Sequence, residues 1–134
     1  MTDQYDSSWT LYAFRNRDFA PTINVDYEGA ELPLTGATVS MQVRQYQGAA
    51  GDPLLEDADV DFTDIAHPTR EGWRRLTLEP RFDRADLAAM PGQNQPDPGD
   101  PQTFDHEIKI TYADSEQDSL GMGPFVLSAG VDAT

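Results

Sequence analysis

Residues 104–112, Phe104-Asp105-His106-Glu107-Ile108-Lys109-Ile110-Thr111-Tyr112, decide the fold class of this chain. Aromatic, aliphatic and histidine side chains occupy the even positions, and polar or charged side chains occupy the odd ones. Successive side chains of a strand point to opposite faces, so this alternation indicates a strand with one buried face. We therefore expect the segment to lie in a sheet that covers a hydrophobic core.

Segments with strand character recur on both sides of this stretch. Thr38–Gln45 alternates Val39, Met41 and Val43 with polar residues, and Leu120–Leu127 predicts a return strand, interrupted by glycines and a proline, after a hairpin loop at 113–119. Further strands are predicted at Trp9–Phe14, Phe19–Tyr27, Leu54–Glu56, Val60–Thr63 and Trp73–Leu78. This pattern is typical of an all-β chain.

One window lacks strand alternation. Arg81–Met90 contains alanine and leucine, which favour helix, with Asp83 placed to cap its start and Pro91-Gly92 placed to end it. A single short helix between two strands fits a sandwich better than a parallel α/β fold. We therefore predict an all-β, antiparallel β-sandwich with one short helix.

The domain organisation follows from length. The chain has 134 residues, the size of one ordinary domain. Residues 92–103 contain three prolines and two glycines, which indicates a long surface loop rather than a domain boundary, because too little chain follows to form a second core. We predict a single β-sandwich over residues 15–134, preceded by residues 1–14 as an N-terminal arm or a first strand.

The charge restricts the partners. The chain carries 24 acidic and 9 basic residues, for a formal net charge of −15. It should repel nucleic-acid phosphates and anionic lipid surfaces, so we expect no nucleic-acid partner and no membrane association. No stretch is apolar enough to span a bilayer, and the acidic N-terminus lacks a secretory signal. Solubility, a basic protein partner and bound cations remain as interpretations of the acid excess.

An acidic run offers the most conspicuous candidate metal site. It comprises Asp57, Asp59, Asp61 and Asp64. Carboxylates can ligate Ca²⁺, but an EF-hand needs glycine at its sixth position and glutamate at its twelfth, where this run has Phe62 and Pro68. We favour a solvated acidic loop or edge strand, with Asp57, Asp59 and Asp61 kept as alternative calcium ligands. Whether the chain binds calcium stays open.

Little in the sequence suggests catalysis. There is no cysteine, and the two histidines, His67 and His106, are far apart. We expect His106 to be a hydrogen-bonded packing residue on the apolar face of its strand and His67 to be exposed in a loop. No nucleophile motif or phosphate-binding loop accompanies them. The sequence predicts a protein that is not an enzyme and has no cofactor.

The N-terminal segment carries the candidate partner-binding residues. It is rich in aromatic side chains and ends in two arginines; the candidates are Tyr5, Trp9, Tyr12, Phe14, Arg15 and Arg17. Aromatic residues and arginine are enriched at protein interfaces. An ordinary first strand is the alternative interpretation. The arginine pairs at 15/17, 74/75 and 81/84 should meet carboxylates, either within the fold or across an interface.

Several stretches resemble small virion proteins of tailed bacteriophages, including the N-terminal domain of baseplate upper proteins. The shared stretches are Arg17-Asp18-Phe19, Ile23-Asn24-Val25, Gly29, Leu34–Val39 and Met41–Arg44, followed by Leu76-Thr77-Leu78, Phe104–Tyr112 and Gly123–Leu127. The long proline loop and the acidic run do not belong to that pattern.

The resemblance implies an immunoglobulin-like β-sandwich that serves as a non-enzymatic assembly module of the tail, baseplate or neck. Its partners would be other phage virion proteins, in a symmetric homo-oligomeric arrangement within the virion. Two alternatives stay open. One is a capsid decoration protein, and the other is a carbohydrate-binding sandwich for host glycans with Trp9, Trp73 or Tyr112 as a stacking platform.

Overall fold

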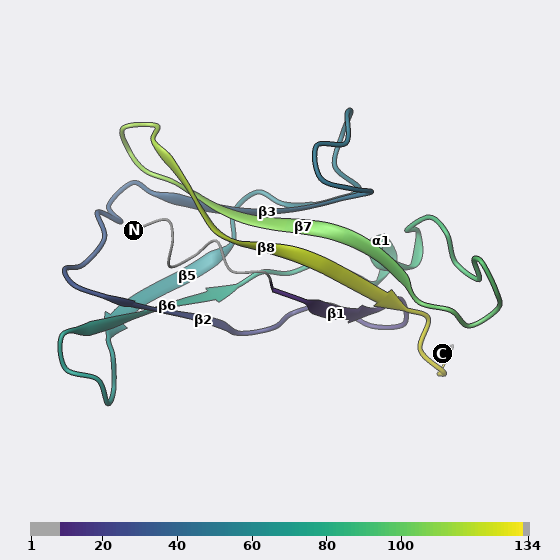
Figure 1. The fold of residues 1–134 in the computed structure, drawn as a ribbon, viewed down its shortest axis with the longest axis horizontal. Coiled ribbons are helices and arrows are strands. Elements are labelled where there is room, and N and C mark those ends of the chain that lie inside the picture. Colours follow the sequence, from purple (N-terminus) through teal and green to yellow (C-terminus); the bar gives the residue numbers. More distant parts are fainter. Residues whose placement is uncertain (1–8, 133–134) are drawn as a thin grey trace.

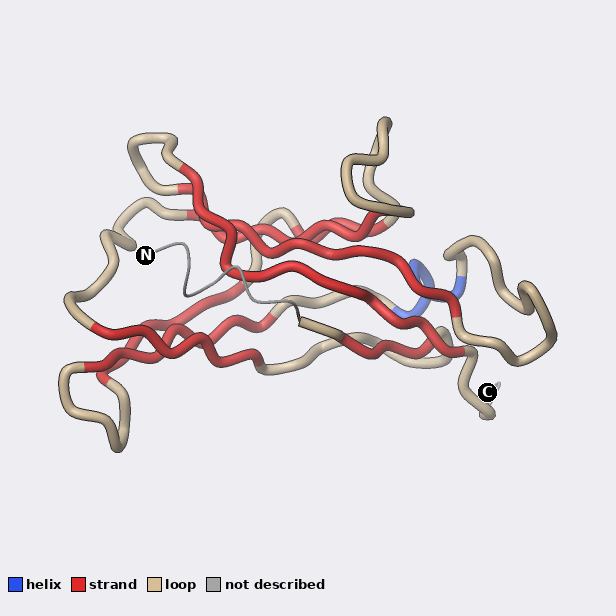
Figure 2. Tube along the Cα trace, in the orientation of Figure 1, coloured by secondary structure: helices blue, strands red, loops and turns tan. Residues whose placement is uncertain are grey.

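Two β-sheets enclose the core in the computed structural model, which describes residues 9–132. The larger sheet has the order β1 (Leu11–Phe14), β8 (Gln117–Ser128), β7 (Gln102–Thr111), β3 (Thr38–Arg44) and β4 (Leu55–Asp57). The smaller has the order β2 (Ile23–Glu28), β6 (Trp73–Glu79) and β5 (Asp61–Ala66). Figure 1 shows the two layers, and Figure 2 shows how strands dominate them. The prediction of an all-β chain with one short helix is confirmed.

The hairpin of β7 and β8 is the centre of the larger sheet. Phe104, Ile108 and Ile110 of β7 are buried, as the alternation predicts. On its other side β7 pairs with β3, whose Val39, Met41 and Val43 are also buried. The side chains on the inner face of this sheet therefore supply much of the core.

Strand β8 is longer than predicted. The sequence suggested a return strand broken at Gly121, Gly123 and Pro124, but β8 continues from Gln117 to Ser128. Its pairing with β7 shifts register once, between Ile108 and Lys109. Gly121 and Gly123 lie where β8 is in close contact with Trp9.

The smaller sheet resolves which face of β6 is buried. Leu76 and Leu78 point into the core, and Arg74, on the same face, forms an ion pair with Asp64. Strand β2 begins at Ile23 rather than at Phe19. Phe19 instead forms an isolated bridge with Phe82, and the two rings stack with centroids 5.7 Å apart.

The first strand departs from the prediction of an antiparallel sandwich. β1 pairs with β8 in parallel, with Leu11 opposite Phe125 and Phe14 opposite Ser128. All other strand pairs are antiparallel. Leu11–Phe14 thus forms a first strand at the edge of the larger sheet, beyond β8 (Figure 1).

The helix is shorter than its sequence window. α1 spans Arg84–Ala88, five residues, and lies between β6 and β7. Asp83 occupies the N-cap position, but its side chain makes no capping hydrogen bond. Leu87 is the buried residue of the helix. No helix within residues 9–132 is long and apolar enough to cross a membrane.

Candidate partner-binding surface

Trp9 docks onto its own domain. Its N–H donates a hydrogen bond to the carbonyl of Met122 (2.9 Å), and its indole ring lies over Gly121. Its backbone passes so close to Gly123 that a β-carbon there would lie within 2.8 Å of three backbone atoms of Trp9. Gly121 and Gly123 therefore leave the space that Trp9 fills. Tyr5, the candidate that precedes Trp9 in the sequence, lies outside the described residues.

Arg15 is buried, and its side chain is hydrogen-bonded inside the domain. The residue is only 4% exposed, and its guanidinium donates to the carbonyls of Met90 and Pro91 and to Oε1 of Gln102. Burial lowers the pKa of Arg15, and the Nε atom has no hydrogen-bond partner. This side chain fixes the start of the proline loop against the end of β1 and is not available at the surface.

Three of the candidates remain at the surface. Tyr12 is 66% exposed. Phe14 is half-buried, and the guanidinium carbon of Arg17 lies 3.8 Å from the centre of its ring. Residues 12 and 14 share one face of β1 because side chains alternate along a strand. We call Tyr12, Phe14 and Arg17 the edge patch.

The other arginine pairs meet carboxylates within the fold. Arg75 donates to Asp26 (2.9 Å), and Arg81 donates to Asp18 (2.9 Å). The hydrogen bond from Arg75 holds the pKa of Asp26 below its usual value. Arg84 contributes its backbone N–H, rather than its side chain, to Asp18.

Asp64 is the buried member of the acidic run. Its side chain is 3% exposed and receives hydrogen bonds from the Tyr27 hydroxyl (2.7 Å) and from Nε of Arg74 (3.2 Å). Burial, with the hydrogen bond to Asp64, raises the pKa of Tyr27 to about 12. Asp64 therefore stabilises the packing of β2, β5 and β6 instead of facing solvent with the rest of the run.

His67 is not exposed, contrary to the prediction. Its side chain is 5% exposed. Nδ1 accepts the backbone N–H groups of Thr69 and Arg70, so the proton of the neutral ring belongs on Nε2, 3.1 Å from Oδ2 of Asp26. A local turn and a cross-strand carboxylate thus fix the ring. Sequence spacing could not show this, because Asp26 is 41 residues away.

His106 lies in the core, as predicted, but without the expected hydrogen bond. The residue is 3% exposed, neither ring nitrogen has a partner of good geometry, and the ring packs edge-on against Phe125. Burial lowers the pKa of His106, although the nearby backbone of Pro124 and Gly123 favours the protonated form. The neutral ring fills space in the core and makes packing contacts rather than hydrogen bonds.

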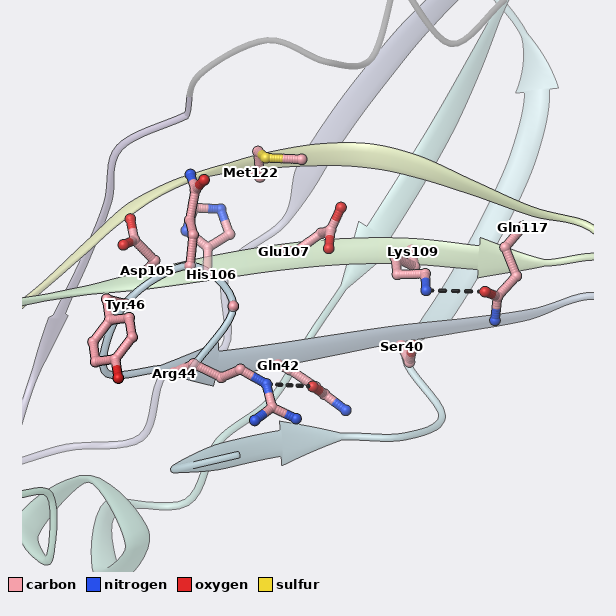
Figure 3. Close-up of a pocket in the computed structure, with 12 residues that line it drawn as sticks. Ser40, Gln42, Arg44, Tyr46, Asp105, His106, Glu107, Lys109, Gln117 and Met122 are labelled. Atoms are coloured by element: carbon pink, nitrogen blue, oxygen red, sulfur yellow. Dashed lines mark hydrogen bonds between the residues drawn. The ribbon is translucent and has the colours of Figure 1, made fainter. Parts of the chain in front are cut away.

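The outer face of β3, β7 and β8 holds a shallow polar hollow of about 420 Å³ (Figure 3). Arg44 donates to Gln42 and to the carbonyls of Ala49 and Gly51, and Lys109 donates to Gln117. Two carboxylates, Asp105 and Glu107, also line it, with Tyr46 and Met122. Neither carboxylate forms an ion pair within residues 9–132. The hollow thus offers both donors and acceptors.

The candidate calcium ligands do not form a metal site in the described part of the chain. Asp57 accepts the backbone N–H groups of Arg81 (2.9 Å) and Asp59 (3.2 Å). No group of three or more acidic or histidine side chains between residues 9 and 132 is arranged to hold a metal ion. Asp57, Asp59 and Asp61 line an open acidic surface beside Arg81.

The proposed stacking platforms are covered. Trp9 packs against the core, Tyr112 is half-buried, and the guanidinium carbon of Arg70 lies 3.4 Å from the centre of the Trp73 ring. The aromatic side chains that stand exposed within residues 9–132 are Tyr12 and Tyr46. Tyr12 belongs to the aromatic N-terminal segment that the sequence singled out, whereas nothing in the local sequence of Tyr46 distinguishes it from buried Tyr27.

Comparisons with known proteins give no relative: no protein-family model matches the chain, and neither curated proteins nor solved structures show a significant match.

Proposed function

We propose that this protein is a non-enzymatic structural protein of a tailed-phage virion, an immunoglobulin-like module of the tail, baseplate or neck that binds other virion proteins. The observation that carries the proposal is the strand order β1-β8-β7-β3-β4 packed on β2-β6-β5. It supports the fold that the sequence resemblance implies.

The order of seven of the eight strands, β2 to β8, supports the immunoglobulin-like part of the proposal. In that plan strands G, F, C and C′ form one sheet and B, E and D belong to the other. β8, β7, β3 and β4 take the first set of places, and β2, β6 and β5 take the second. The first strand joins β8 in parallel instead of lying beside β2, which is a departure from the simplest form of the plan.

The stretch that carries the resemblance has a structural role in this arrangement. Gly36 has a φ of 80°, which favours glycine, and a β-carbon there would lie 3.2 Å from the β-carbon of Ala113. The turn leads directly into β3, whose Met41 and Val43 are buried. The shared residues are therefore those that build the sandwich.

The surface supports a binding role for the larger sheet. The exposed aromatic side chains Tyr12 and Tyr46 both belong to this sheet or to the loop that follows β3. Exposed aromatic side chains are common anchors of protein interfaces. The proposal requires that the partners are other virion proteins and that copies of this chain are arranged symmetrically in the particle.

The test is to purify particles of the phage or prophage that encodes the chain and to locate the chain by immunogold electron microscopy. Label on the tail tip or neck is the expected result, and label over the shell would favour the capsid decoration alternative. Recovery of the chain only in the unassembled fraction would refute a virion role. Removal of residues 1–14 is a poor test, because it also removes β1 and Trp9.

A carbohydrate-binding sandwich is the second candidate, and the polar hollow favours it. Its two cations and two carboxylates balance in charge, and Tyr46, 60% exposed, stands at its rim. A neutral polyol that donates and accepts hydrogen bonds suits such a surface better than an anion or a cation. Titration calorimetry with host surface glycans should show binding that Tyr46→Ala removes and Tyr12→Ala retains. Absence of heat with every glycan would reject this candidate.

A further inference from the structure

We infer that two copies of this chain pair through the open edges of their β1 strands, in an antiparallel arrangement about a two-fold axis at Tyr12. This inference deepens the proposed function, since it names one contact by which an assembly module would form symmetric copies. Three features of the described residues carry it: the protection of the other edges, the direction of the β1 backbone and the distribution of charge.

The other three sheet edges carry charged side chains. β4 is only three residues long and contains Glu56 and Asp57. The outer strands of the smaller sheet also carry exposed acids, Asp61 on β5 and Glu28 on β2. Short length and charge are the usual means by which proteins prevent edge-to-edge pairing. β1, with the sequence Leu-Tyr-Ala-Phe, has no charge and no proline.

The backbone of β1 presents free groups at that edge. The N–H groups of Trp9 and Arg15 donate to carbonyls of β8 (2.9 and 2.8 Å). Because backbone groups alternate in direction along a strand, the odd residues face β8 and the even residues face away from it. Thr10, Tyr12 and Phe14 therefore direct their N–H and C=O groups to the open edge.

The charge distribution favours a second copy as the occupant. The chain has 24 acidic residues, so most contacts between two copies would bring carboxylates together. Neither residues 9–17 nor residues 119–131 contain an acidic residue. The edge formed by β1 and its neighbour β8 is thus a place where two copies meet without that repulsion.

A two-fold axis at Tyr12 gives a self-complementary register. Tyr12 lies opposite Tyr12 of the second copy, Thr10 lies opposite Phe14 of the second copy, and the two-fold axis repeats this last pair as Phe14 opposite Thr10. These three residue pairs, each exchanging two backbone hydrogen bonds, would form about six such bonds. The two-fold contact is closed, so it yields a dimer and a continuous ten-stranded sheet rather than a filament.

The test is sedimentation velocity over a wide range of protein concentration at physiological salt. The wild-type mass should rise from 14.8 kDa toward twice that value. Tyr12→Glu places a like charge on the axis and should abolish the rise. Tyr46→Glu is the matched control, because Tyr46 is similarly exposed at 60% but lies after β3. Tyr12→Pro removes the outward N–H and should have the same effect as Tyr12→Glu.

Circular dichroism and urea unfolding of the variants would show that any loss of the dimer is not a loss of the fold. A wild-type chain that stays monomeric at all concentrations overturns the inference, as does a dimer that survives Tyr12→Glu. A strand of another protein bound at β1, with the chain itself monomeric, would also overturn it. The proposed function fails separately: it fails when the chain is absent from particles, whatever its mass in solution.

Discussion

The indole ring of Trp9 occupies the space over Gly121 of β8, where a β-carbon would lie 2.5 Å from Cε3 of the ring. Two residues 112 positions apart are therefore matched in size. The absence of a side chain at 121 lets the N-terminal segment lie flat on the sheet and lead into β1. The glycines of β8 weaken strand propensity locally, but they allow this close contact.

We expect Gly121→Ala to destabilise the protein by about 1–3 kcal/mol, the usual cost of overpacking. The same substitution should cost about 0.5 kcal/mol or less in a Trp9→Ala background, because the ring that it displaces is then absent. Urea unfolding of the four proteins in this double-mutant cycle measures the difference. Equal costs in both backgrounds would show that Trp9 does not pack there in solution.

Arg15 and Arg17 should respond differently to lysine. Arg15→Lys replaces a planar group that reaches three acceptors with one ammonium, and should cost about 2 kcal/mol. Arg17, which lies at the surface over Phe14, should tolerate lysine within about 0.5 kcal/mol. Chemical denaturation of both variants tests this contrast, and similar losses in the two would argue against an interior role that is particular to Arg15.

His106 should make stability depend on pH in the weakly acidic range. Its pKa in the fold lies below the ordinary value of 6.5 because of burial, so the unfolded chain takes up a proton first as pH falls. Stability should therefore decrease as pH drops below about 6.5, by at most about 1.4 kcal/mol per pH unit.

The measurement is the free energy of unfolding between pH 7.5 and about 5, above the range in which most carboxylates titrate. His106→Leu removes the titrating group while it keeps an apolar side chain of similar reach, so its profile should be flatter than that of the wild type. Parallel profiles would mean that other groups cause the dependence.

Replacing Asp57 should destabilise the fold more than replacing Asp59, although both residues belong to the acidic run. Asp57→Ala deprives the Arg81 N–H of its acceptor and should cost about 1 kcal/mol. Asp59→Ala removes an exposed carboxylate from a chain of net charge −15 and should be neutral within about 0.5 kcal/mol or slightly stabilising. Thermal unfolding of both variants gives the comparison. A rise in the wild-type Tm with Ca²⁺, reversed by a chelator, would instead indicate a calcium site.

The alternation of apolar and polar residues correctly predicted the buried faces of β3 and β7, because this pattern lies within each strand's own sequence. Val43 and Ile108 lie on faces that the two-residue period marks, and the structure buries both. The boundaries near Phe19 and Gly121 were less predictable, because they depend on contacts with Phe82 and Trp9. Local sequence carries no record of such long-range partners.

The candidate surface was predictable only as a set of residue types. The N-terminal segment has an interface-like composition, yet Trp9 and Arg15 turn inward while Tyr12 stays exposed. No difference in residue type separates them. What separates them is the face on which each lies: side chains alternate along a strand, and the place of β1 beside β8 turns the odd positions toward the core.

By itself, the sequence determined that this chain is all-β and that β3 and β7 each bury one face, since the two-residue alternation of apolar side chains is visible in neighbouring residues. Tertiary structure alone decided that His67 is buried beside Asp26 and that Asp64 accepts a hydrogen bond from Tyr27 instead of facing solvent. It also decided that β1 pairs in parallel with β8 and forms an uncharged edge of the sheet. Each of these depends on which distant segments become neighbours. That choice is made by packing two sheets against each other, and no local pattern specifies it.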